Sequence, residues 1–300
     1  MENKSFKSEE KKAPQPPGGH SPGAEAPAKS FFGVIIHSFF VIPFLIAVFS
    51  VLLFAAVRIL TMEQHTIYDY LNDVKTGSLT KRWQSAFELS KVMSNPKLIP
   101  DDERFTNELI NAFNQSARDD NRVRQYLALA MGRTGNTRYV LPLLKALQTD
   151  KEENLYSIIY ALGMLRGEQA ALAIQEQLDN PDARIRLACV IALGNIADPK
   201  SLESLKRALH DSEPNVQWDA AIALAKMRNS SGRDVLLKLL DRNYLSQFSA
   251  LDQQTQNHVI MITIEAASLL NDPEINRTIQ QLGQTDKNMN VRKTALAATK

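Results

Sequence analysis

A repeat of 31 residues runs through the second half of the sequence, and it constrains the fold more than any other feature. A column of small residues fixes the register, each 31 positions after the last: Gly132, Gly163, Gly194 and Ala225. A second column holds only alanine: Ala130, Ala161, Ala192 and Ala223. A repeat of this length is typical of stacked structural units that bury their apolar faces against one another.

Each repeat unit contains two helical patterns. After the small-residue columns, apolar residues recur four positions apart, which is about one helical turn. They form two columns: Leu143, Ile174, Leu205 and Leu236, and Leu147, Leu178, Leu209 and Leu240. The segment Asn180-Pro181-Asp182 ends one unit and starts the next with residues that stop and start helices. The pattern of each unit therefore predicts a helix A, a short turn and a helix B. The small residues would let neighbouring A helices approach closely.

Degenerate units flank the four clear ones. Residues 81–93 with 103–113 form an earlier pair, and residues 259–270 with 274–282 form a later pair after an insertion of 12 residues. Val291 opens a last helix A. The sequence thus predicts an all-α solenoid over residues 80–300, with about six helical pairs and a remnant, joined to the preceding segment by a connector at 61–79.

The repeat motif resembles a known family. Asp182 to Ile196 best matches [D/E]-x-x-[V/I]-R-x-x-A-x-x-A-L-G-x-[I/L], which is similar to HEAT repeats of the short kind also found in phycobilisome lyases. The resemblance implies a HEAT/armadillo-like α-α superhelix that binds proteins, with helix B lining the inner docking face. It also implies a ladder of arginines, Arg124, Arg186 and Arg292, each paired with an acid of an adjacent unit. The acids considered are Asp119, Asp120, Glu152, Glu153, Asp182, Glu213 and Asp286.

Residues 31–57 contain no charged side chain and lie between Lys29 and Arg58. About 20 apolar residues suffice for a helix to cross a bilayer, so this run predicts a transmembrane helix within residues 31–60. A cleaved signal peptide is the alternative, but its apolar core is shorter and lies nearer the N-terminus. Three lysines before the run, against Arg58 and Lys75 after it, favour an extracytoplasmic body by one residue.

Residues 1–30 are rich in proline, lysine, glutamate and small residues. Such a segment buries too little apolar surface to offset the entropy lost on ordering, so it predicts a disordered tail. Pro14 and Pro17 have the PxxP spacing of a Pro-rich ligand, which remains an alternative for this segment.

Charge and motif content argue against several classes of function. The body carries 29 basic and 29 acidic residues, which disfavours nucleic-acid binding. One cysteine, Cys189, excludes a disulfide framework and a CxxC zinc site. The HExxH, GxSxG, Walker and GxGxxG motifs are absent, and so are the His-Glu dipeptides of HEAT-repeat di-iron hydroxylases. We therefore expect no catalytic activity, cofactor, metal or small-molecule substrate.

Basic residues recur on the predicted B helices and suggest a docking face for an acidic partner: Lys145, Lys206, Arg207, Arg233 and Lys238. The sequence as a whole therefore favours a single-pass membrane protein whose solenoid is a scaffold for protein partners. A phycobilin-lyase-like protein handling a chromophore, and a structural subunit of a membrane transport complex, are the alternatives.

Overall fold

The computed structural model describes residues 37–60 and 65–299 and divides the chain into two compact units, Met1–Gln64 and His65–Lys300. The tail predicted at 1–30 lies outside the described residues, as does the beginning of the apolar run at 31–36. Within the described ranges the regular structure is helical, with no strand.

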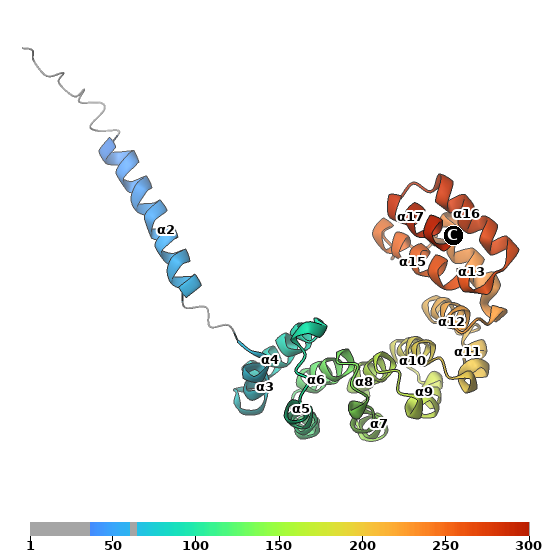
Figure 1. The fold of residues 1–300 in the computed structure, drawn as a ribbon, viewed down its shortest axis with the longest axis horizontal. Coiled ribbons are helices and arrows are strands. Elements are labelled where there is room, and N and C mark those ends of the chain that lie inside the picture. The colour runs from blue at the N-terminus through green and yellow to red at the C-terminus, as the bar shows by residue number, and fades with distance from the viewer. Residues whose placement is uncertain (1–36, 61–64, 300) are drawn as a thin grey trace, which may run out of the picture. The chain divides into compact units, whose positions relative to one another are not determined.

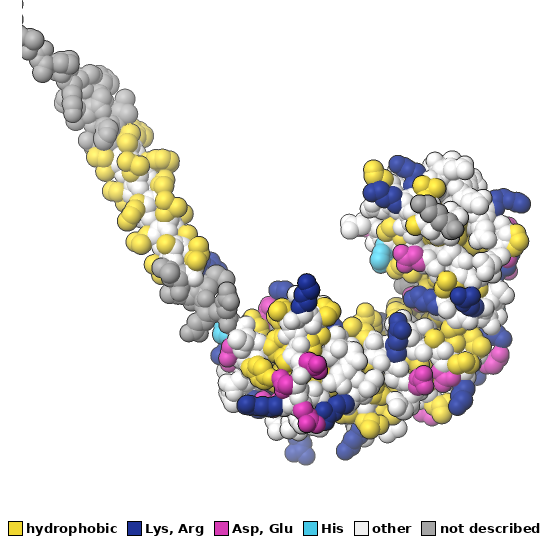
Figure 2. All heavy atoms as spheres, in the orientation of Figure 1, with side chains coloured by type: hydrophobic (Ala, Val, Ile, Leu, Met, Phe, Trp, Pro, Cys, Tyr) yellow, Lys and Arg dark blue, Asp and Glu magenta, His cyan; other side chains and the backbone are white. Residues whose placement is uncertain are grey.

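The described part of the first unit is one long apolar helix. A π-helical turn, His37–Val41, leads into α2 (Ile42–Leu60). The turn ends two residues before Pro43, whose missing N–H cannot donate an α-helical hydrogen bond. Residues 39–59 have a mean hydropathy of 2.9 and none is buried, and Figure 2 shows hydrophobic side chains over the visible face of this helix. By length and composition, α2 could cross a bilayer.

The second unit consists of helices joined by short turns, many of them 3₁₀ turns (Figure 1). Their bounds are α3 (Ile67–Thr76), α4 (Leu79–Val92), α5 (Glu103–Gln115), α6 (Asn121–Arg133), α7 (Val140–Thr149), α8 (Glu152–Met164), α9 (Ala171–Glu176), α10 (Ala183–Ile196), α11 (Leu202–Ala208), α12 (Pro214–Lys226), α13 (Arg233–Leu239), α14 (Arg242–Leu245), α15 (Gln253–Ala267), α16 (Pro273–Thr285) and α17 (Met289–Ala298).

The predicted alternation of helices A and B is confirmed. The A helices are α4, α6, α8, α10, α12, α15 and α17, and the B helices are α5, α7, α9, α11, α13 and α16. The segment at 61–79, expected as a connector, contains the regular helix α3. Its cap is a reciprocal pair, in which Thr66 and Asp69 each accept from the other's backbone N–H. Ile67, Leu71 and Val74 are buried, so α3 covers the first pair of the solenoid.

Neighbouring A helices from α6 to α12 approach closely because glycine faces alanine at the three junctions between them. Gly132 faces Ala161, Gly163 faces Ala192, and Gly194 faces Ala223. A Cβ placed on Gly163 would lie 2.6 Å from the Ala192 Cα. The B helices carry leucines instead and have few contacts with one another.

This difference in spacing curves the second unit. The closely packed A helices lie on the inner side of the arc and the B helices on the outer side (Figure 1). The expectation that helix B lines the inner face is therefore wrong. The small-residue columns belong to helix A, and the layer with the smaller separation must lie inside the curve.

The insertion of 12 residues packs onto α12 and closes the core there. Trp218 lies edge-on to Phe248, with ring centroids 4.8 Å apart, and its Nε1 donates to the Tyr244 hydroxyl at 3.1 Å. Two hydrophobic clusters meet at this helix, one ending at Leu224 and the other beginning at Trp218. Helix α12 is thus shared between two cores.

The A helices end at a recurring backbone position with positive φ. The column runs at intervals of 31 residues through Gly135, Arg166, Ala197 and Arg228, with φ between 51° and 68°, and Asn271 follows after the insertion at 52°. A left-handed residue lets the chain leave a helix sharply, and glycine adopts it with the least strain. At three of the four repeat-spaced positions the chain instead places an L side chain there.

We expect Gly163→Ala to lower the free energy of unfolding by about 1–3 kcal/mol, although alanine favours a helix interior. The added methyl group would press against the Ala192 backbone, which cannot move away as a flexible side chain can. Denaturant unfolding measures the effect. Gly283→Ala is the matched control, because its nearest neighbour is the end of the Leu296 side chain. Equal stability for both variants would contradict the close-packing account.

We expect Ala197→Gly to raise the free energy of unfolding by about 0.5–1 kcal/mol, since relief of the left-handed strain outweighs the added entropy of the unfolded chain. Gly135→Ala is the reciprocal variant, with no neighbouring atom in the way, and should lower it by a similar amount. Thermal melts of both variants test the column, and changes of the same sign in both would refute it.

Candidate protein-docking surface

Each A helix in the middle of the solenoid exposes one stripe, on the side away from the B helices. In α8 this stripe is Glu152, Tyr156, Tyr160 and Met164, four residues apart, while most of the intervening residues are buried. Because the A helices form the inner layer, these stripes together form the inner face of the solenoid.

Aromatic and aliphatic side chains occupy the centre of the inner face. We call this set the aromatic floor, and it comprises Phe87 of α4, Tyr126 of α6, Tyr156 and Tyr160 of α8, and Leu187 and Ile191 of α10. Phe87 and Tyr126 meet edge to face with centroids 5.2 Å apart, and Tyr156 lies parallel to Tyr160 at 6.2 Å. Phe87 is 40% exposed and Tyr156 43% exposed. Apolar rings with this exposure are available to a partner.

Polar residues border the aromatic floor on both sides. At the N-terminal ends of the A helices the border consists of Arg122, Glu152, Glu153 and Arg184. Arg122 lies over the Trp83 ring, with its guanidinium carbon 4.4 Å from the ring centroid, and binds Asp120 at 2.6 Å. At the C-terminal ends the border includes Arg133, which donates to the Ser90 carbonyl. An apolar centre with a polar rim is the usual anatomy of a protein interface.

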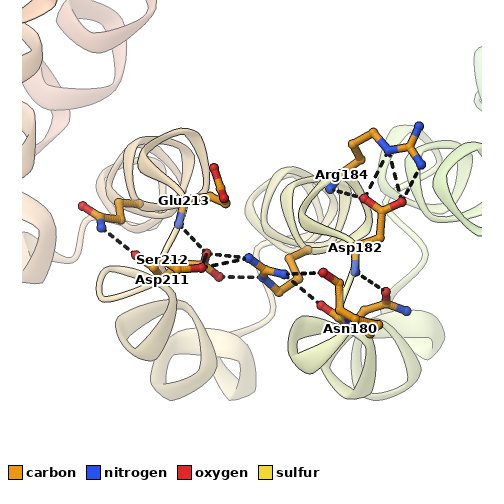
Figure 3. Close-up of polar contacts among 9 residues, drawn as sticks. Asn180, Asp182, Arg184, Asp211, Ser212 and Glu213 are labelled. Atoms are coloured by element: carbon orange, nitrogen blue, oxygen red, sulfur yellow. Dashed lines mark hydrogen bonds and ion pairs between the residues drawn. The ribbon is translucent and has the colours of Figure 1, made fainter. Parts of the chain in front are cut away.

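Buried ion pairs hold the edge of the solenoid near this surface. Arg186 of α10 binds Asp211, just after α11, through Nε and Nη2, both at 2.8 Å (Figure 3). The same connection, from a helix A or the insertion to the acid that follows a helix B, recurs in three places. These pairs are Arg82 with Asp119, Arg124 with Asp150, and Arg242 with Asp286. Each pair therefore connects a helix A, or the insertion, to the turn that follows a helix B.

Arg124 and Arg186, expected to pair with acids of an adjacent unit, instead bind the acid that follows helix B of their own unit. Arg124 and Arg186 bind Asp150 and Asp211, which were not among the acids considered. Arg292 donates from Nη1 to the Asp286 carbonyl at 2.6 Å rather than to a carboxylate. Arg82 and Arg242 were missed. A spacing of 31 residues between Asp119 and Asp150 was the available signal for the acid column.

The basic residues predicted as a docking face lie on the B helices, hence on the outer layer. Lys145, Arg207 and Lys238 are exposed. Lys206 binds Glu203 at 2.8 Å, and Arg233 binds Asp272 at 2.8 Å and also Glu274. Ion pairing therefore reduces the charge that two of the five offer to a partner. Whether the column binds a partner stays a prediction.

The register residues and Cys189 have structural positions. Gly132, Gly163 and Gly194 are contact points between A helices, and Ala225 is buried. Cys189 is buried in α10, and burial raises the pKa of its thiol, so the thiolate that a nucleophile needs is disfavoured. Among residues 37–60 and 65–299, no cluster of three or more metal-ligating side chains occurs.

Comparisons with known proteins agree on the fold. The profile for HEAT repeats matches residues 172–251, and that for the PBS lyase HEAT-like repeat matches residues 123–149. These two segments therefore match HEAT-type repeats, and the expectation of a HEAT/armadillo-like solenoid fold is confirmed. The comparison with curated proteins gives no match.

Two solved structures illustrate the likeness. The complex of CpcE and CpcF of phycocyanin lyase from Nostoc sp. PCC7120 is 18% identical, with a TM-score of 0.55 over 80% of this chain and 95% of that chain. A designed armadillo repeat protein in complex with the peptide (KR)4 is 16% identical, with a TM-score of 0.42 over 78% of this chain and 98% of that one. At this identity the first likeness concerns the fold alone.

We expect Asp211→Asn to lower the free energy of unfolding by about 2 kcal/mol at neutral pH, because it leaves the half-buried Arg186 without its anion. Hydrogen bonds from Arg186 lower the pKa of Asp211. A lowered pKa contributes stability above the unfolded value of about 3.9, and that contribution is lost as the pH falls through the folded value. The cost of the substitution should therefore shrink below about pH 4.

Unfolding measured across this pH range checks the sign. Asp234→Asn removes a carboxylate that is 88% exposed and contacts Arg233, and it should change little at any pH. A cost for Asp211→Asn that stays constant down to acid pH would contradict the ion-pair account.

Proposed function

We propose that this HEAT-repeat chain is a membrane-anchored scaffold that docks a partner protein on the inner face of its solenoid. The observation that carries the proposal is the aromatic floor, where Phe87 and Tyr156 are each about two-fifths exposed on a concave layer of packed helices. Tyrosine and other aromatic side chains are enriched where protein partners bind, and a rigid surface loses little entropy on binding.

The extent of the floor favours a protein partner over a small molecule. It crosses α4, α6, α8 and α10, four consecutive A helices, so an elongated segment could contact several repeats at once. The fold likeness to CpcE and CpcF, which are solved as a complex with each other, supports a protein partner for this chain too. We further propose that the chain binds no nucleic acid and catalyses no reaction.

The apolar run supports the anchor. Residues 39–59, which include most of α2, would span the bilayer. The small excess of lysine before the run favours an extracytoplasmic solenoid.

Two other functions share the same fold. The likeness to phycocyanin lyase favours a chromophore-handling protein, and visible absorbance of the purified chain would support that function instead. A subunit of a membrane transport complex would purify together with transporter subunits. Protease accessibility in sealed vesicles, before and after detergent, tests both the anchor and the side that the solenoid occupies.

Site-specific photo-crosslinking tests the docking surface. A photoreactive phenylalanine derivative at Tyr126 should crosslink a protein partner in native membranes, because this ring lies on the inner face. The same derivative at Lys145, on the outer layer, is the matched control and should not. Crosslinks from Lys145 alone would place the docking site on the basic residues of the B helices instead. Crosslinks from neither position would refute the scaffold.

A further inference from the structure

The inner face contains a cavity of about 530 Å³ at the N-terminal ends of α6, α8 and α10. We propose that this cavity receives an arginine side chain of the docked partner, an inference that rests on the proposed function and names the chemistry of its ligand. The cavity is lined by Gln125, Glu152, Glu153, Tyr156, Ser157, Asp182, Arg184 and Ile185.

The charge of the lining selects a cation. Three carboxylates line the cavity against one guanidinium. Arg184 binds Asp182, with Nη2 2.6 Å and Nε 3.1 Å from the carboxylate, so this pair is internally neutral (Figure 3). Glu152 and Glu153 are exposed and form no ion pair among the residues that the structure describes. Their two negative charges remain available to a ligand.

The aromatic wall selects the kind of cation. Tyr156 presents its ring at the cavity, held parallel to Tyr160. A guanidinium is planar, so it stacks on a ring and still forks onto a carboxylate, whereas an ammonium is a compact point charge. The ring of Tyr156 and the carboxylates of Glu152 and Glu153 therefore match arginine better than lysine.

The chain itself uses this combination twice. Arg122 lies over the Trp83 ring and binds Asp120, and Arg124 lies 4.0 Å from the Phe113 ring centroid and binds Asp150. Ring and carboxylate together hold a guanidinium in both places.

The cavity lies two repeat units after the site in which Arg122 contacts the Trp83 ring and Asp120, at the equivalent position of the repeat. Arg184 and Asp182 are each 62 residues after Arg122 and Asp120. Arg184 is 83% exposed, against 51% for Arg122, and contacts no ring among the described residues. Glu153 of α8 occupies the same column one unit after Arg122, and it adds a negative charge beside the open ring of Tyr156.

Fluorine NMR of the full chain in detergent micelles tests this, with 3-fluorotyrosine replacing tyrosine. The Tyr156 signal is identified by its loss in Tyr156→Phe. N-acetyl-arginine amide should shift that signal saturably, and the neutral isostere N-acetyl-citrulline amide should not. The double variant Glu152→Gln, Glu153→Gln should weaken arginine binding about tenfold. Arg184→Ala should strengthen it, because a competing cation is removed.

The double variant Glu168→Gln, Glu176→Gln is the control for the loss of two negative charges. It removes one exposed acid shortly before α9 and one at its end, and it should leave arginine binding unchanged. Equal shifts with citrulline, or arginine binding unaffected by the Glu152 and Glu153 changes, would overturn the proposal. N-acetyl-lysine amide binding as tightly as arginine would overturn the choice of guanidinium. Crosslinks from Tyr126 without arginine binding would refute the arginine site but would still support the proposed docking function.

Discussion

The contact between glycine and alanine in consecutive A helices is the constraint on which the solenoid depends. Gly132, Gly163 and Gly194 each face an alanine of the next unit, and a side chain at Gly163 would meet backbone within 2.6 Å. This contact sets the smaller of the two layer spacings. The curvature, the inner position of the A helices and the concave face that carries the aromatic floor all follow from it.

The repeat architecture could be predicted from the sequence because each unit repeats the same physical solution. Columns of glycine, alanine and leucine report burial directly, and their 31-residue register fixes which residues face one another. Helix α3 was missed because it has no repeat column to match. Its reciprocal cap at Thr66 and Asp69 was the local signal present in the sequence.

The docking surface was less predictable, for a physical reason. Which layer lies inside depends on the relative separation of two sets of helices, and that separation emerges only when close contacts are summed around the arc. The basic column of Lys145, Arg207 and Lys238 was visible in the sequence, but its outer position was not. Likewise, Arg186 could be singled out, whereas its partner Asp211 lies 25 residues away in a turn with no strict column.

Helix α12 contributes side chains to two hydrophobic clusters, one running back to α3 and one forward to α17. The N-terminal part and the C-terminal part therefore share a single helix as their common wall. A pulling force on the two ends of the solenoid would act on two cores in series. Unfolding of the less stable core would lengthen the molecule in a discrete step while the other core stayed folded.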